Sequence, residues 1–354
     1  MADKLFIPGP VDVSPDVLER MACPMIGHRS KAYAELHHST VERLKKVFYT
    51  GNTVFLGPCS STGWMEAAVR NCVSEKSLHV VNGAFSSRWH KIAELNGKNP
   101  EKIEVEWGSG AKPGDVEEKL SSGEFEALFV THNETSTGVM TPLEGFGKVC
   151  RDNNVLFCVD AVSSAGGVKI DVDELGIDVL VTGTQKAFAV PPGLAMTVLS
   201  EAALKKSETV KNRGLYFDYQ DFLKKAVKDN TPSTPPVSLI NALCYQLGKI
   251  LDEEGLENRY ARHAKMADYT RSWVKKHWEM LPQDWCASNT VTCAKNTRKT
   301  DLAELSKKLL EKGYLFSNGY GKLKGDAFRV AHMGDRTMDE LKEYLETIDD
   351  IVGL

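Results

Sequence analysis

Short apolar segments alternate with helix-length segments over the first two thirds of this 354-residue chain, and this alternation constrains the fold most. Strands that alternate with helices form a mostly parallel sheet covered by helices on both faces. Segment 155–159 is apolar at every position, which is typical of a strand buried on both sides. The sequence therefore predicts an α/β fold. The expected strands are 53–56, 78–81, 103–106, 127–131, 155–159 and 179–182.

The pattern changes near residue 236, where two long helices are followed by shorter elements. We predict an extended N-terminal segment at 1–17, a large α/β domain at 18–253 and a smaller α+β domain at 254–354. A break between the two long helices is expected at 253–255. The expected C-terminal elements are helices 237–251, 256–277, 301–312 and 337–351, with strands 290–293 and 328–331.

Composition and charge exclude several classes of protein. Hydrophobic residues make up 42% and charged residues 26%, as in folded globular chains. The net charge of −4 offers no basic excess for nucleic acid, and no apolar stretch reaches the ~20 residues that span a bilayer. No secretory signal opens the sequence, and the eight cysteines form no Cys-x-x-Cys pair. We expect a cytoplasmic protein that uses no nucleic acid, membrane or metal.

Two titratable residues follow buried strands and are candidates for chemistry. Lys186 follows strand 179–182, and Asp160 follows strand 155–159. Ligands of open α/β sheets bind at the carboxyl ends of the strands. There a lysine can form a Schiff base with an aldehyde, and an aspartate can pair with a protonated pyridine nitrogen. The alternative interpretations are a solvated loop lysine and, for the aspartate, a helix N-cap or a metal ligand; no cluster of His, Cys or Asp with metal-ligand spacing accompanies it.

Three further features allow a functional and a structural interpretation. Ser60, Ser61 and Thr62 end one strand and open a helix, which is typical of a phosphate site and also of ordinary helix capping. Phe85 is either a ring-stacking residue or a core aromatic. Arg329 lies in a short apolar strand, where its guanidinium suits a substrate carboxylate or an internal salt bridge.

Taken together, in their order along the chain, the motifs resemble the class V, fold-type I pyridoxal-phosphate aminotransferases, in particular the alanine–glyoxylate and serine–pyruvate group. The likeness extends over nearly the whole chain and implies a mostly parallel seven-stranded sheet in the large domain. The matching segments are Ile7-Pro-Gly-Pro10, Met25-Ile-Gly-His-Arg-Ser30, Ser61-Thr-Gly-Trp-Met-Glu-Ala67, His132-Asn-Glu-Thr-Ser-Thr-Gly138, Val159-Asp-Ala-Val-Ser-Ser164, Gly183-Thr-Gln-Lys-Ala187, Ser233-Thr-Pro-Pro-Val237 and Phe328-Arg-Val-Ala-His-Met-Gly334.

The resemblance implies a role for each matching position. Lys186 and Asp160 are the implied catalytic residues, the first binding pyridoxal 5′-phosphate covalently and the second pairing with its ring nitrogen. Arg329 and Gly27 are implied to contact the substrate. Thr234 is implied to reach the phosphate of a neighbouring subunit, so a homodimer with composite active sites is expected. The other implied cofactor contacts are Ser60, Ser61, Thr62, Phe85, Thr135, Val162 and Gln185.

Two positions depart from the family pattern. Phe85 occupies the ring-stacking position where relatives often carry tryptophan, which preserves stacking but removes an N–H donor. Thr231 stands where some relatives place a tyrosine on the partner's phosphate, so that contact is expected to be shorter or water-mediated. Neither change affects the implied roles of Lys186 and Asp160.

The expected reaction is a ping-pong transamination from a small amino acid, alanine or serine, to a 2-oxo acid, glyoxylate or pyruvate. One strong carboxylate anchor is apparent, which suits small side chains. The alternative is a phosphoserine or aminoalkylphosphonate transaminase, for which extra cationic groups are available at His28, Arg29, His332 and Arg336.

Two other functions are less favoured. A lyase or cysteine desulfurase needs a nucleophilic cysteine on a mobile loop, and the sequence context of Cys286 and Cys293 does not suit this role. A non-enzymatic binding protein on the same fold has little support while both Lys186 and Asp160 are present.

Overall fold

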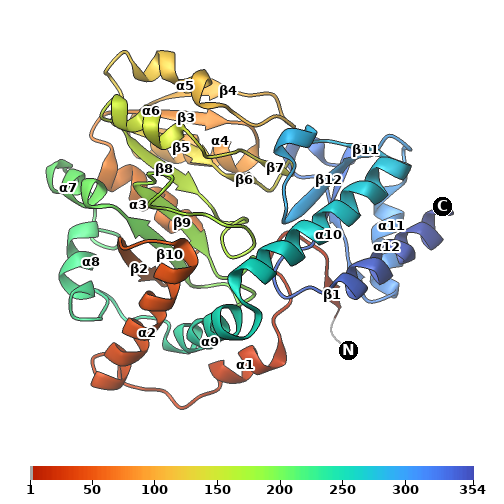
Figure 1. The fold of residues 1–354 in the computed structure, drawn as a ribbon, viewed down its shortest axis with the longest axis horizontal. Helices are drawn as coiled ribbons and strands as arrows, with labels where there is room; N and C mark the ends of the chain where they lie inside the picture. Colours follow the sequence, from red (N-terminus) through yellow and green to blue (C-terminus); the bar gives the residue numbers. More distant parts are fainter. Residues whose placement is uncertain (1–2) are drawn as a thin grey trace.

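The computed structural model describes residues 3–354, which form a large unit around a seven-stranded sheet and a smaller C-terminal unit (Figure 1). The strand order is β2-β10-β9-β8-β5-β3-β4. Strand β10 is antiparallel to both of its neighbours, and the pairs from β9 to β4 are parallel. The strands are β2 (Thr53–Gly57), β3 (Lys76–Val81), β4 (Asn99–Glu104), β5 (Ala127–Thr131), β8 (Leu156–Asp160), β9 (Val179–Gly183) and β10 (Ala195–Leu199).

Helices cover both faces of this sheet. One face packs in a buried cluster with α1 (Pro15–Met21), α2 (Lys31–Phe48), α5 (Pro113–Leu120), α6 (Phe146–Asp152) and α9 (Val237–Gly248). The other face packs with α3 (Ser61–Cys72), α4 (Ala84–Leu95), α7 (Glu201–Thr209) and α8 (Tyr219–Ala226). The expected α/β fold with a mostly parallel seven-stranded sheet is confirmed.

The alternation of side chains along β8 determines where its last residue lies. Phe157 and Val159 belong to the cluster with α2 and α9, whereas Cys158 belongs to the cluster with α3 and α4. Because successive side chains of a strand point to opposite faces, Asp160 shares the side of Cys158. The carboxyl group therefore faces the N-terminal ends of α3 and α4.

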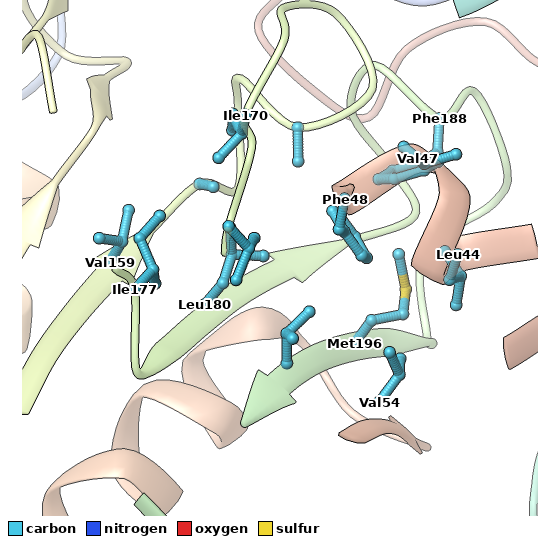
Figure 2. Packing of buried hydrophobic residues seen from close by; sticks show 14 of the residues in the cluster. Leu44, Val47, Phe48, Val54, Val159, Ile170, Ile177, Leu180, Phe188 and Met196 are labelled. Carbon is cyan, nitrogen blue, oxygen red and sulfur yellow. The ribbon is translucent and has the colours of Figure 1, made fainter. Parts of the chain in front are cut away.

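Figure 2 shows part of the apolar packing on the opposite face of the sheet. There Leu180 of β9 and Met196 of β10 lie between the sheet and α2, which contributes Phe48 and Leu44. Residues of both sheet faces are almost fully buried. This two-sided burial explains why β5, β8 and β9 have continuous apolar sequences.

The smaller unit contains an antiparallel sheet in the order β11-β12-β15-β14, packed against helices. Helix α10 runs from the edge of the large unit into the smaller one (Figure 1). The N-terminal strand β1 (Lys4–Leu5) pairs with β13, and Phe6 stacks on Tyr344 with ring centroids 3.8 Å apart. The elements are α10 (Leu256–His277), β11 (Glu279–Met280), β12 (Val291–Lys295), α11 (Leu302–Glu311), β13 (Tyr314–Leu315), β14 (Ser317–Asn318), β15 (Ala327–Ala331) and α12 (Met338–Val352).

Two strands of the large sheet differ from the sequence-based expectation. The strand expected at 103–106 is wrong, because β4 occupies Asn99–Glu104. Among the described strands this edge strand pairs only with β3, and none of its side chains is fully buried, so it carries no apolar run. Strand β10 follows the Pro191–Gly193 turn without a helix before it, so the strand–helix alternation did not predict it.

Two helical boundaries also differ. Residues 249–254 continue α9 as a π-helix, and the break is confined to Gly255, whose φ of +78° suits glycine. The N-terminal segment expected to be extended over 1–17 turns into α1 at Pro15, because proline is favoured at the first position of a helix. Residues 1 and 2 of that segment lie outside the described residues.

Between the two units, short elements complete the chain. Strands β6 (Asn133–Glu134) and β7 (Val139–Met140) form a small hairpin beside the end of β5.

None of the helices in residues 3–354 is both long enough and apolar enough to cross a membrane. Over the same residues, no three His, Cys, Asp or Glu side chains gather as the ligands of a metal ion would.

Candidate active site

A cavity of about 380 Å³ lies at the edge of the large sheet where its parallel strands end. Ligands of open α/β sheets bind at this edge because the carboxyl ends of parallel strands meet there. Nine of the predicted site residues line it: Ser60, Ser61, Thr62, Phe85, Thr135, Asp160, Val162, Gln185 and Lys186. The other lining residues had been assigned no role from the sequence, although all but Arg88 lie in the matching segments; they are Gly9, Pro10, Met65, Arg88, Asn133 and Ser163.

Lys186 lies in a turn just beyond the end of β9. The hydroxyl of Thr184 donates to the carbonyl oxygen of Leu194 at 3.0 Å, which ties this turn to the start of β10. The Nζ of Lys186 donates to the carbonyl oxygen of Pro8, so the N-terminal segment crosses the cavity at the lysine. Burial lowers the pKa of Lys186 to about 8, and the positive charge of Arg329 acts in the same direction.

Asp160 is the last residue of β8 and is 4% exposed. The backbone N–H of Val162 donates to its Oδ1 at 2.9 Å, and this is the side chain's one hydrogen bond within residues 3–354. Burial raises the pKa of Asp160 to about 7, with a further contribution from the negative charge of Glu134, while Lys186 opposes the shift. A cationic group with an N–H beside this carboxyl would stabilise its charged form.

An anion site is formed where β2 leads into α3. Ser61 Oγ is buried and has no hydrogen-bond partner within the described residues. A Cβ at Gly183 would lie 2.3 Å from Ser61 Oγ and 2.8 Å from Gln185 Oε1, so only glycine lets both polar groups face the cavity. The N-terminus of the 12-residue α3 adds free N–H groups and a positive dipole end. This arrangement suits a phosphate group.

The position of Phe85 depends on Glu134, which the sequence analysis did not single out. Glu134 is fully buried, and its Oε2 accepts the backbone N–H groups of Phe85 at 3.0 Å and Ser86 at 2.9 Å. No basic side chain in residues 3–354 forms an ion pair with it. A carboxylate at the first turn of a helix is stabilised by the free N–H groups and the helix dipole. Glu134 therefore holds the start of α4 and the backbone of Phe85 in place.

Arg88 follows Phe85 by one helical turn and also escaped the sequence analysis. Its guanidinium carbon lies 4.8 Å from the ring centroid of Phe85, in a cation–π arrangement. Its positive charge contributes to the lowered pKa of Lys186 and partly opposes the rise in the pKa of Asp160 that burial causes. The spacing of three residues on one helix was the available signal, because such residues lie on the same helix face.

The floor of the cavity is a network of buried hydroxyl and amide groups. Thr135 Oγ1 donates to Ser163 Oγ at 2.7 Å, and Ser163 Oγ donates to the carbonyl oxygen of Asn133 at 2.8 Å. The side-chain amide of Asn133 donates to Thr290 Oγ1 at 3.1 Å. Thr290 precedes β12, so this network joins the large sheet to the smaller unit.

Arg329 comes to the site from β15 of the smaller unit and is 8% exposed. Its Nη1 donates to the carbonyl oxygen of Thr135 at 3.3 Å. Its Nε and Nη2 donate to the carbonyl oxygen of Asn318 at 3.2 and 3.1 Å. It does not line the cavity itself, although its charge acts on Lys186. Three of its five N–H bonds are used in this way, which leaves two for a ligand.

Two predicted site residues lie apart from this cavity. Gly27 and Thr234 are both exposed and do not line it. The segments that carry them are joined, since Arg29 donates to the carbonyl oxygens of Thr231 at 2.6 Å and Pro232 at 3.0 Å. Gly27 and Thr234 thus belong to one surface of this chain.

The extra cationic groups named for a phosphorylated substrate, at His28, Arg29, His332 and Arg336, do not line the cavity of this chain. Arg336 forms ion pairs with Asp12 and with Glu340, the second at 3.3 Å. His332 is buried and bonded to Thr292 Oγ1 at 2.9 Å, and burial lowers its pKa to about 3. Arg29 binds backbone carbonyls, as described above, and His28 does not line the cavity.

The cysteines considered for a desulfurase are also outside the cavity lining. Burial raises the pKa of the Cys293 thiol to about 12 and also raises that of Cys286. A raised pKa suppresses the thiolate, which is the nucleophilic form of cysteine.

Comparisons with known proteins identify the family of this chain. The profile of the aminotransferase class-V family matches residues 65–319. An uncharacterised aminotransferase of Methanocaldococcus jannaschii is 40% identical, covering 93% of this chain and 87% of its own. A serine–glyoxylate aminotransferase of Methylorubrum extorquens is 35% identical, covering 94% and 86%. The crystal structure of an alanine–glyoxylate aminotransferase from Nostoc sp. superposes with a TM-score of 0.94 at 27% identity, covering 99% and 96%. The chain therefore belongs to the class V aminotransferases, and it is an enzyme of fold type I.

Proposed function

We propose that this aminotransferase uses pyridoxal 5′-phosphate to move the amino group of alanine or serine to glyoxylate or pyruvate. The observation that carries the proposal is the convergence of Lys186, Asp160 and the Ser61–Gln185 pair on one cavity. The names of two relatives, a serine–glyoxylate and an alanine–glyoxylate aminotransferase, support glyoxylate as the acceptor.

The residues present fit this cofactor. The unpaired hydroxyl of Ser61, the amide of Gln185 and the N-terminus of α3 would hold its phosphate. Asp160 would pair with the ring nitrogen, and a protonated nitrogen there would offset the burial that raises the pKa of this carboxyl. Lys186 supplies the amine that binds the aldehyde. The remaining contacts would come from Phe85 and Val162 on the ring, Thr135 near its hydroxyl, and Ser60 and Thr62 near the phosphate.

When bound, the cofactor supplies an electron-withdrawing ring that favours loss of the substrate's α-proton. Lys186 would carry this proton at Nζ once the amino group of the substrate has displaced the lysine from the cofactor. Its pKa of about 8 leaves part of the amine neutral near neutral pH, so it can accept a proton and return it. Asp160 would keep the ring nitrogen protonated, and Arg329 would hold the substrate by its carboxylate.

The substrate is expected to be small because Arg329 has only two N–H bonds left after binding Thr135 and Asn318. Two parallel N–H bonds match one carboxylate. One observation favours a second candidate: Arg88 lines the cavity and has no ion-pair partner within residues 3–354. A donor with an anionic side chain, such as phosphoserine, would use Arg88 as its second anchor.

The proposal includes a homodimer with composite active sites. Gly27 and Thr234 stand at positions that resemble the substrate-binding and phosphate-binding positions of the family. Both are exposed, and neither lines the cavity of its own chain. Since Arg29 binds the segment of Thr234, a second copy of the chain would deliver both residues together. Sedimentation at assay concentration should show a dimer, and a fully active monomer would contradict this part of the proposal.

A donor panel tests the substrate class. Alanine, serine, aspartate and phosphoserine are each assayed with glyoxylate, pyruvate and 2-oxoglutarate, using the wild type and Arg88→Gln. Highest kcat/KM for alanine or serine with glyoxylate or pyruvate supports the proposal. A preference for phosphoserine that collapses in Arg88→Gln supports the second candidate instead.

Borohydride reduction and peptide mapping test the role of Lys186. Only the Lys186 peptide should carry the reduced cofactor. Lys98 is an internal control, because burial lowers its pKa as well, although it lines a different cavity. A label on Lys98 alone, or no label, would sink the assignment.

A further inference from the structure

Tyr320 of the smaller unit contacts three groups at the cavity and has no role in the chemistry described above. Its ring stacks on that of Phe85, with centroids 5.4 Å apart and planes inclined by 23°. The guanidinium carbon of Arg329 lies 5.6 Å from its ring centroid. Nη2 of Arg88 donates to its hydroxyl at 3.4 Å. Tyr320 thus touches the proposed carboxylate anchor and the proposed ring-stacking residue at once.

The loop that carries Tyr320 is closed by Asn318, the same residue that holds Arg329. Asn318 Oδ1 accepts the N–H groups of Gly319 at 2.7 Å and Gly325 at 2.9 Å, which ties the two ends of the loop together. The carbonyl oxygen of Asn318 accepts Nε and Nη2 of Arg329. The loop and the arginine therefore form one local structure.

This loop also rests on the large unit at a second point. Nζ of Lys322 lies 4.0 Å from the centroid of the Trp107 ring, in the connection between β4 and α5. With the contacts of Tyr320 to α4, the loop is held at two places on the opposite unit. Tyr320 is nevertheless 39% exposed, so burial of its ring alone does not explain these contacts.

We propose that Tyr320 is a positioning residue for transamination, which holds Arg329 of the smaller unit in register with Phe85 of the large one. The aromatic face attracts the guanidinium, and the offset stack fixes the ring of Phe85. The hydroxyl contact with Arg88 is long, so the ring carries the role. This inference rests on the proposed function, because Arg329 and Phe85 are assigned there to substrate and cofactor.

The test compares Tyr320→Ala, Tyr320→Phe and the control Tyr269→Ala. Tyr269 is 38% exposed on α10, and Nζ of Lys342 lies 5.9 Å from the centroid of its ring. The readouts are KM and kcat for alanine and glyoxylate, and the Kd of the apoprotein for pyridoxal 5′-phosphate from absorbance titration. In Tyr320→Ala we expect KM for both substrates to rise roughly tenfold, with a smaller change in kcat and a several-fold weaker cofactor Kd.

Tyr320→Phe should keep the wild-type KM, kcat and Kd, and Tyr269→Ala should not change them. Unchanged KM and Kd in Tyr320→Ala, an equal loss in Tyr320→Phe, or an equal loss in Tyr269→Ala would each overturn the inference. If Tyr320→Ala does not fold, Tyr320→Leu gives the same comparison, because it keeps apolar bulk without an aromatic face. A wild-type protein that neither binds the cofactor nor transaminates would overturn the proposed function, and this role with it.

Discussion

Replacing Asp160 with asparagine is expected to stabilise the apoprotein at pH 8 while weakening its affinity for pyridoxal 5′-phosphate. The carboxyl is 4% exposed, and burial raises its pKa from 3.8 to about 7. A difference of this size corresponds to roughly 4 kcal/mol of lost folding free energy once the carboxyl is charged. Asparagine removes the charge and keeps an oxygen for the N–H of Val162.

The pH dependence follows from the direction of this pKa change. Between pH 3.8 and about 7 the folded protein retains a proton that the unfolded chain has released. Stability of the wild type therefore falls as the pH rises through this interval, and the penalty is complete above it. Because asparagine does not titrate, the advantage of Asp160→Asn should grow across the same interval, from near zero to at most ~4 kcal/mol.

Urea unfolding of apoprotein from pH 4 to pH 8 measures this difference, with Asp326→Asn as the exposed control. Titration with the cofactor at pH 8 should show the opposite order, because only the wild type offers a negative charge to the ring nitrogen. A stability difference that does not change with pH would refute the reasoning. So would an Asp160→Asn apoprotein that is less stable than the wild type at pH 8.

Three further predictions concern the surroundings of the cavity. Gly183→Ala should weaken cofactor binding at least tenfold in absorbance titrations, because its Cβ would press on Ser61 and Gln185. The control Gly114→Ala on α5, which has open space around it, should leave cofactor binding unchanged. Equal Kd values for the two variants would contradict the anion site. Glu134→Gln should lower the free energy of unfolding by about 1–3 kcal/mol, because N–H groups of α4 lose a charged acceptor, and an unchanged urea midpoint would count against its capping role. Arg329→Lys should reduce kcat/KM roughly tenfold to a hundredfold for every amino and oxo acid alike, since all share the carboxylate; a loss confined to one substrate would argue against the anchor.

The positions of Lys186 and Asp160 were predictable because each comes at or just after the end of a largely apolar strand. Such strands are buried on both faces and end at one edge of the sheet, so the two side chains had to meet. The edge strand β4 was misplaced because its polar and apolar residues do not form a continuous run. Glu134 and Arg88 were missed although they lie close in sequence to Thr135 and Phe85, since a single charged residue has no periodicity.

The sequence by itself determined the α/β class, the order of the motifs and the residues at the carboxyl ends of β8 and β9, because local apolar patterns specify burial directly. Only the tertiary structure decided which charges remain free at the cavity. Arg336 and His332 are engaged by Asp12, Glu340 and Thr292, whereas Arg88 is left beside Phe85. Asp12 and Thr292 are distant in the chain from their partners Arg336 and His332, so these contacts depend on how distant segments pack. No local pattern in the sequence records that packing.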